Sequence, residues 1–197
     1  MHNIYITDAI VLSKRGVGEA NTLVSLFTKE LGLVRASARS ARFEKSKLRY
    51  GLEPLTQGRF SMVRGRHEWK LTGVERLSRD YISPSFTSRQ RMGRLARLLL
   101  RLIHGEEPVP ELYNTVAEGF EYVSRATTEQ DAENIECVLV LRILSHLGYL
   151  PQTPEIMPFV DTPPAGRFFS LELAAEVARS RTFLIRAINE SLGATGL

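Results

Sequence analysis

The residues best suited to chemistry in this sequence are cations that gather between positions 35 and 49, where Glu44 is the one opposing acid. Arg35 and Arg39 are four positions apart, so on a strand they project from the same side. A second group of cations surrounds the expected hairpin turn at 64–66. Such side chains neutralise the phosphates of a polyanion. The two groups are Arg35, Arg39, Arg42, Lys45, Lys47 and Arg49, and then Arg64, Arg66 and Lys70.

Aromatic residues are interleaved with these cations: Phe43, Tyr50, Phe60 and Trp69. Exposed rings stack on unpaired bases, so a basic surface that carries them is typical of proteins that bind single-stranded nucleic acid. Phe60 and Trp69 lie inside expected strands, and we expect both to be core residues.

The net charge of +4 conceals a division along the chain. Residues 1–105 carry 20 Lys/Arg against 8 Asp/Glu, a net of +12, and residues 106–197 carry 6 against 14, a net of −8. This asymmetry predicts a front half that binds nucleic acid, an anionic membrane or an acidic protein. No basic amphipathic segment has a bulky aromatic face, which makes the membrane the weakest of the three.

Catalytic and metal-binding patterns are poor. The four histidines are scattered, with none at the i, i+4 spacing of a metal-binding helix. Gly16-Val17-Gly18 lacks the third glycine and the lysine of phosphate-binding loops. Cys137 is the one cysteine, which excludes an internal disulfide, and its apolar surroundings predict a buried thiol. We therefore expect no enzyme, no metal site and no cofactor.

The elements that position the cations are strands followed by helices, which predicts an α+β fold with segregated elements. Five short strands suggest a small closed barrel. Apolar residues at helical spacing then begin at Met92, a capping box begins a helix at Thr128, and five prolines make 151–164 a loop. The expected strands are Ile6–Lys14, Thr22–Thr28, Leu33–Arg39, Leu55–Arg64 and Trp69–Glu75. The expected helices are 84–103, Glu111–Arg125, Thr128–Gly148, Leu171–Arg179 and Thr182–Ser191.

We therefore expect a nucleic-acid-binding domain at 1–79 and a helical, partner-binding domain at 80–197. Arg94, Arg97 and Arg101 share one face of the first helix. This arginine stripe either extends the nucleic-acid surface or pairs with acids of the second half. Glu106, Glu107, Glu111 and Glu118 are the candidate acids.

The order of several segments resembles the bacterial DNA repair protein RecO family. Residues 38–46, Ala-Arg-Ser-Ala-Arg-Phe-Glu-Lys-Ser, are similar to the family's Ala-Lys-Gly-Ala-Arg-Arg-Pro-Lys-Ser signature. Residues 141–151 resemble its helix-ending Leu-Arg-Leu-Leu-x-x-Leu-Gly-Tyr-x-Pro. The likeness spans about 1–151 and includes Ala9–Leu12, Gly18–Gly32, Leu52–Leu55 and Val63–Arg66.

This resemblance implies an N-terminal five-stranded OB-fold barrel followed by an all-helical domain. It implies a mediator of DNA repair and recombination that binds single- and double-stranded DNA, anneals complementary strands and assists RecA loading. The implied partners are RecR and the C-terminal tail of single-stranded DNA-binding protein. At the positions that match the family signature, the resemblance implies four DNA contacts: Arg39, Arg42, Lys45 and Ser46. Arg142 is a candidate cation for the tail, or else forms a salt bridge within the helical domain.

Departures from the family pattern carry information too. Many members have a four-cysteine zinc site after the Leu-Gly-Tyr segment, but 151–164 contains no cysteine, so this chain resembles the zinc-less type. Ser40 stands where the signature has glycine.

Two alternatives to this function stay open, an RNA-binding OB-fold module and a non-catalytic protein adaptor. The N-terminus lacks a signal-peptide pattern and no apolar run approaches ~20 residues, which predicts a cytoplasmic protein without membrane contact.

Overall fold

A computed structural model describes residues 3–66, 68–76, 85–161 and 169–196. The chain forms two compact units: Met1–Ser83 with Gly93–Tyr113, and Pro84–Met92 with Asn114–Leu197. The expected boundary between 79 and 80 falls outside the described residues, so a division into domains at that point stays a prediction.

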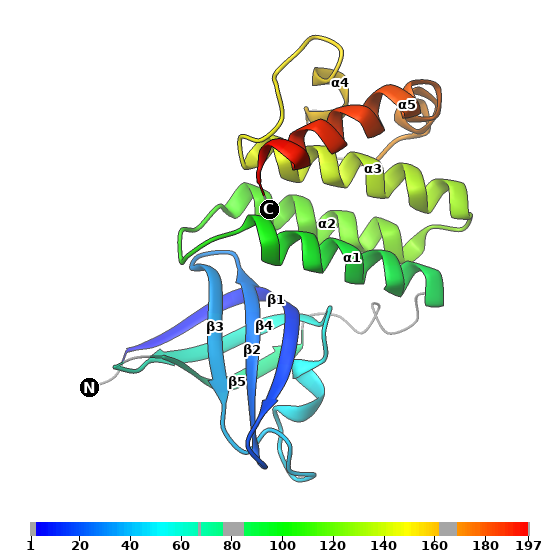
Figure 1. The fold of residues 1–197 in the computed structure, drawn as a ribbon. Coiled ribbons are helices and arrows are strands. Elements are labelled where there is room, and N and C mark those ends of the chain that lie inside the picture. Colours follow the sequence, from blue (N-terminus) through cyan, green and yellow to red (C-terminus); the bar gives the residue numbers. More distant parts are fainter. Residues whose placement is uncertain (1–2, 67, 77–84, 162–168, 197) are drawn as a thin grey trace. The chain divides into compact units, whose positions relative to one another are not determined.

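Five strands form a closed barrel in the first unit, in the order β1-β2-β3-β5-β4 (Figure 1). All pairs are antiparallel except β3 with β5. The first half of β1 pairs with β4 and the second half with β2, with an irregularity between Val11 and Ser13 that bends the strand. The expected five-stranded OB-fold barrel is confirmed. The strands are β1 Ile4–Val17, β2 Asn21–Thr28, β3 Gly32–Ala38, β4 Gln57–Arg64 and β5 Trp69–Arg76.

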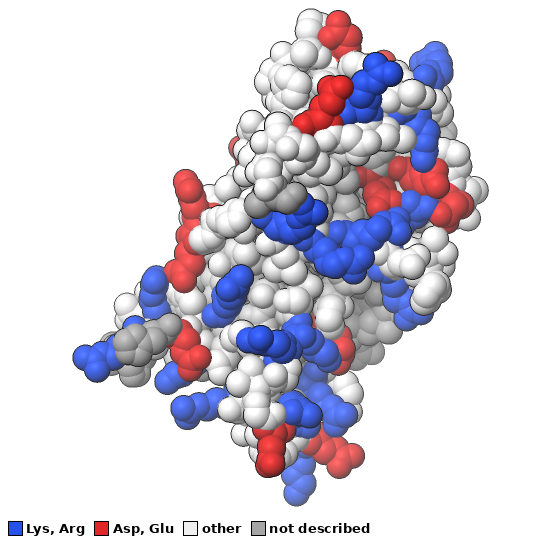
Figure 2. Space-filling view, in the orientation of Figure 1, with Lys and Arg blue, Asp and Glu red and all other residues white. Residues whose placement is uncertain are grey.

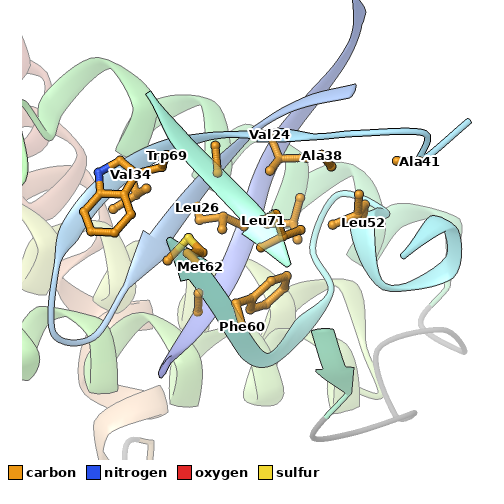
Figure 3. Close-up of a cluster of buried hydrophobic side chains, with 13 residues drawn as sticks. Val24, Leu26, Val34, Ala38, Ala41, Leu52, Phe60, Met62, Trp69 and Leu71 are labelled. Carbon is orange, nitrogen blue, oxygen red and sulfur yellow. The ribbon is translucent and has the colours of Figure 1, made fainter. Parts of the chain in front are cut away.

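Alternate residues of the strands fill the barrel with apolar side chains (Figure 3). Val24 and Leu26 come from β2, Phe60 and Met62 from β4, and all four are fully buried. Trp69 contacts Tyr5 edge to face, with 5.0 Å between ring centroids. Phe60 and Trp69 are core residues, as expected.

The segment after the first helix packs on the barrel at the β2–β3 turn, within the first unit. Leu33 N donates to Gly105 O, and the Phe27 and Tyr113 rings lie 5.7 Å apart. Gly32 has φ +68° in this turn, and a Cβ on it would lie 2.5 Å from Glu107 O. Only glycine fits the turn, since a side chain would meet both a strained backbone and a clash.

In the described residues five α-helices follow the barrel, which confirms the α+β class. The expected cap of α3 is present, because Asp131 N donates to Thr128 Oγ1. In the second unit α3 packs against both α4 and α5. The helices are α1 Phe86–Leu102, α2 Pro110–Arg125, α3 Glu129–His146, α4 Met157–Val160 and α5 Leu171–Ala194.

Two expectations about the C-terminal part were wrong. One continuous helix, α5, replaces the two short helices, because 179–181 contains neither glycine nor proline and the buried stripe Val177, Leu184 and Ser191 runs through it. The proline-rich segment 151–164 contains the short helix α4. Pro158 lies at its start, where a missing N–H costs nothing. Residues 162–164 of that segment lie outside the described residues.

Candidate nucleic-acid interface

The loop between β3 and β4 is fixed at both ends by buried side chains and backbone hydrogen bonds. Ala41 and Leu52 are buried in the barrel core. Ser40 adopts φ 55°, the left-handed conformation that favours the glycine of the family signature, and its N–H donates to Asn21 Oδ1. Arg42 N donates to Ala20 O. The basic loop, as we call residues 39–50, is therefore tied to the β1–β2 turn.

The cations predicted on this segment are exposed, and Lys and Arg predominate on the visible face of the barrel around the loop (Figure 2). Arg35 lies on the outer face of β3 between buried Val34 and Ala36. Ser46 is half-buried, and its N–H donates to Phe43 O. The exposed cations of this group are Arg35, Arg39, Arg42, Lys45, Lys47 and Arg49.

Two aromatic side chains stand out on the same loop. Phe43 is 56% exposed and Tyr50 69% exposed. The Arg49 guanidinium lies 5.9 Å from the centre of the Tyr50 ring. Rings of this kind beside cations are the elements that bind unpaired bases and their phosphates.

Two of the hairpin cations, Arg64 and Arg66, lie away from the basic loop. Because β3 and β5 are parallel, the hairpin before β5 and the loop after β3 lie at opposite ends of that pair. Arg64 pairs with Glu106 at 3.1 Å and stacks on Trp69, whose Nε1 donates to the same carboxylate. Arg66 is exposed and Lys70 half-buried. Lys70 pairs with Ser37 of β3, next to the stretch that carries Arg35, so among the ten predicted contact residues Arg64 and Arg66 are the two that lie apart.

A hollow of about 520 Å³ opens beside the basic loop. Lys14, Arg42, Arg49 and Glu53 line it. Sequence reasoning missed Lys14 because it falls within an expected strand. The available signal was the Lys14-Arg15 pair directly before Gly16, where a strand end places cations at the rim of a barrel.

The arginine stripe is exposed, but the buried cation of α1 is a different residue. Arg91 is 6% exposed and contacts the carboxylates of Glu129, Glu133 and Glu136 on α3. Burial lowers the pKa of Arg91, but hydrogen bonds to Glu136 and Glu129 outweigh it and raise the pKa overall. We call this group, with Arg181 bound to Glu133, the Arg91 network.

Arg142 is 2% exposed, and burial lowers its pKa although Glu118 acts in the opposite direction. Its guanidinium donates to Phe159 O at 3.3 Å and Asp161 O at 3.4 Å, so it holds the chain around α4. A role in partner binding stays a prediction, and this burial weighs against it.

The remaining candidates for chemistry do not converge. His104 and His146 bond to Leu102 O and Thr115 respectively, while His2 and His67 lie outside the described residues. Cys137 is partly buried, where a buried thiol was expected, and this burial raises the pKa of the thiol to about 11. Across 3–66, 68–76, 85–161 and 169–196, no three His, Cys, Asp or Glu are placed to hold a metal ion. No helix in those ranges is long and apolar enough to cross a membrane.

The fold and this surface define a class, the OB-fold proteins that carry an exposed basic loop and are followed by a helical region. Residues 1–78 match the family model "Recombination protein O N terminal", and residues 92–155 match "Recombination protein O C terminal". The chain belongs to the RecO family.

Curated relatives agree with this assignment. DNA repair protein RecO of Cutibacterium acnes is 30% identical over 88% of this chain and 72% of its own length. The proteins of that name from Thermodesulfovibrio yellowstonii and a Synechococcus species are 32% and 29% identical, each over 75% of this chain. The chain spans 58% and 55% of those two relatives.

Proposed function

We propose that this protein is a non-catalytic mediator of DNA repair and recombination that binds DNA through the basic loop and anneals complementary strands. The observation that carries the proposal is the exposure of Phe43 and Tyr50 among the cations of a loop tied to an OB-fold barrel. Two strands on one neutralising surface repel each other less, so their bases can pair without covalent chemistry.

The proposed contacts to single- and double-stranded DNA are the predicted ones. The loop supplies most of them, and the hairpin end of the barrel provides a second place for a strand. Arg64 contributes less there because Glu106 already pairs with it. The proposed DNA contacts are Arg35, Arg39, Arg42, Lys45, Ser46, Lys47, Arg49, Arg64, Arg66 and Lys70.

The proposed partners are those that the sequence resemblance implies. We propose that the chain acts in the cytoplasm with RecR and with the acidic, apolar C-terminal tail of single-stranded DNA-binding protein, and so assists RecA loading. An apolar groove with a nearby cation suits such a tail. A groove of about 400 Å³ in the second unit combines Tyr122, Ile135 and Leu171 with Arg125, which pairs with Glu121, and Asp131 lines it too. Arg125 is exposed and Arg142 is buried, so Arg125 is the better candidate cation for the tail, and Arg125→Glu is expected to abolish binding of a labelled tail peptide.

Strand annealing tests the proposal. Labelled complementary oligonucleotides, bare or coated with single-stranded DNA-binding protein, are mixed with the full chain over a range of salt. We expect acceleration that weakens steeply as salt rises, and a salt slope reduced by about 1.4 in Arg42→Ala/Lys45→Ala on single strands. Arg179→Ala/Arg186→Ala is the matched control, because it removes two exposed arginines of α5.

Each other outcome contradicts a stated part of the proposal. An unchanged slope in the loop variant removes the loop from the interface. Tighter binding to RNA than to DNA of equal length favours the RNA-binding module. No binding at all, beside a tight protein complex, favours the adaptor.

A further inference from the structure

The hollow beside the basic loop is lined by a cation that is held in place, Arg42, and by an anion of the chain itself, Glu53. It lies within the first unit, between the start of the basic loop, η1 (Arg49–Leu52), the end of β1 and the start of β2. Its charged lining consists of Lys14, Arg42, Arg49 and Glu53. At about 520 Å³ it has room for a phosphate group together with its sugar.

Arg42 is held in place before any ligand arrives. Its Nη1 donates to Gly18 O at 2.7 Å, and its backbone N–H donates to Ala20 O. The guanidinium lies against Gly16, where a Cβ would be 3.4 Å from Nη1. A guanidinium has five N–H donors in a fixed fork, so anchoring one end orients the remainder toward an anion.

Lys14 forms an ion pair with the carboxylate of Glu53. Its Nζ lies 2.6 Å from Glu53 Oε1, and both side chains line the hollow. The Lys14 and Glu53 side chains are 38% and 56% exposed, so the pair is a weak one that solvent and ions compete for. The carboxylate of Glu53 thus lies where a phosphate oxygen bound to Lys14 would lie.

We propose that this hollow is a phosphate subsite for single-stranded DNA, in which a backbone phosphate binds Arg42 and displaces Glu53 from Lys14. The inference rests on the proposed function and specifies one subsite of it. Arg49 adjoins both the hollow and the Tyr50 ring, so the base next to the bound phosphate stacks on Tyr50. Competition from Glu53 weakens each contact, which lets strands leave after they pair.

The test measures anisotropy of a labelled oligothymidylate with the full chain over a range of salt. Glu53→Gln is expected to tighten binding about two- to fivefold at low salt, since an exposed ion pair of this kind is weak. In this variant the salt slope steepens by about 0.7, because Lys14 binds a phosphate without having to release the Glu53 carboxylate. Lys14→Gln is expected to weaken binding by a similar factor.

The double variant Lys14→Gln/Glu53→Gln separates this subsite from a general effect of charge. If Glu53 acts through Lys14, adding Glu53→Gln to Lys14→Gln restores little affinity. Glu121→Gln is the matched control, because it breaks an exposed pair of equal length, with Arg125, in the other unit. This control leaves oligothymidylate affinity and slope unchanged.

Two failures are distinguishable. If the unaltered chain binds with a steep salt slope but Glu53→Gln changes neither affinity nor slope, the subsite is overturned and the proposed function stands. An equal gain from Glu53→Gln with and without Lys14 also overturns it. If the unaltered chain binds no DNA even at low salt, the proposed function fails and the subsite fails with it.

Discussion

The basic loop and the Arg91 network use the same side chain in opposite ways. On the loop, Arg39, Arg42 and Arg49 are exposed. In the network, Arg91 is buried among three carboxylates of α3. A buried cation must be paired to be tolerated, and that pairing leaves it unable to attract a ligand. An arginine's contribution to function therefore depends on its burial and partners, whereas the charge of its segment says little.

The largest expected effect comes from removing the buried cation. Arg91→Leu removes the cation that Glu129, Glu133 and Glu136 share, and Arg181 still binds Glu133; we expect a loss of about 3–5 kcal/mol in the free energy of unfolding. Urea unfolding measures it. Arg97→Ala, an exposed arginine of the same helix, is the control and changes the free energy by about 0.5 kcal/mol or less. Equal losses in the two variants would remove the contrast between network and surface.

Cys137 lies near the same network, because the charges of Arg181 and Glu136 both act on its thiol. Burial is the largest cause of its raised pKa; Arg181 lowers the pKa and Glu136 raises it. The ordinary value is 9.0 and the folded value about 11, so the folded thiol holds its proton more tightly. This contribution to stability is complete below pH 9 and is lost as pH rises toward 11. At pH 8 we expect iodoacetamide to label the folded chain about 100-fold more slowly than the urea-unfolded chain. Cys137 is partly buried, and similar rates would mean that its folded surroundings do not raise the pKa of the thiol.

A smaller effect is expected from the aromatic part of the loop. Tyr50→Ala removes a ring that is 69% exposed, so folding is unaffected. We expect single-stranded DNA to bind about 1–2 kcal/mol more weakly, because stacking is lost, and duplex affinity to stay nearly constant. Anisotropy with both ligands measures the difference. Equal weakening with both would show that Tyr50 does not stack on bases.

The smallest effect concerns the backbone of the loop. Ser40 is held at φ 55°, so Ser40→Gly relieves strain but adds freedom to the unfolded chain. We expect a net gain of about 0.5 kcal/mol in stability, with DNA affinity unchanged. Thermal unfolding checks the sign, and a loss of stability would show that the serine side chain supports the turn.

Much of the fold was predictable from local pattern. Alternation in the strands and the turn residues between them predicted the barrel, and the apolar spacing from Met92 predicted α1. The single helix α5 could have been found too, because its buried stripe continues through 179–181 without a breaker. Predicting two helices there gave too much importance to a short polar stretch.

The sequence by itself determined the charge division, the order of strands and helices, and the segment that carries the cations. Tertiary structure decided which cations are exposed. It buried Arg142 beneath the carbonyls around α4, brought Arg91 to three acids up to 45 positions away, and placed Lys14 opposite Glu53 across 39 positions. The reason is physical: exposure and pairing depend on contacts between segments distant in the chain, which no local periodicity encodes.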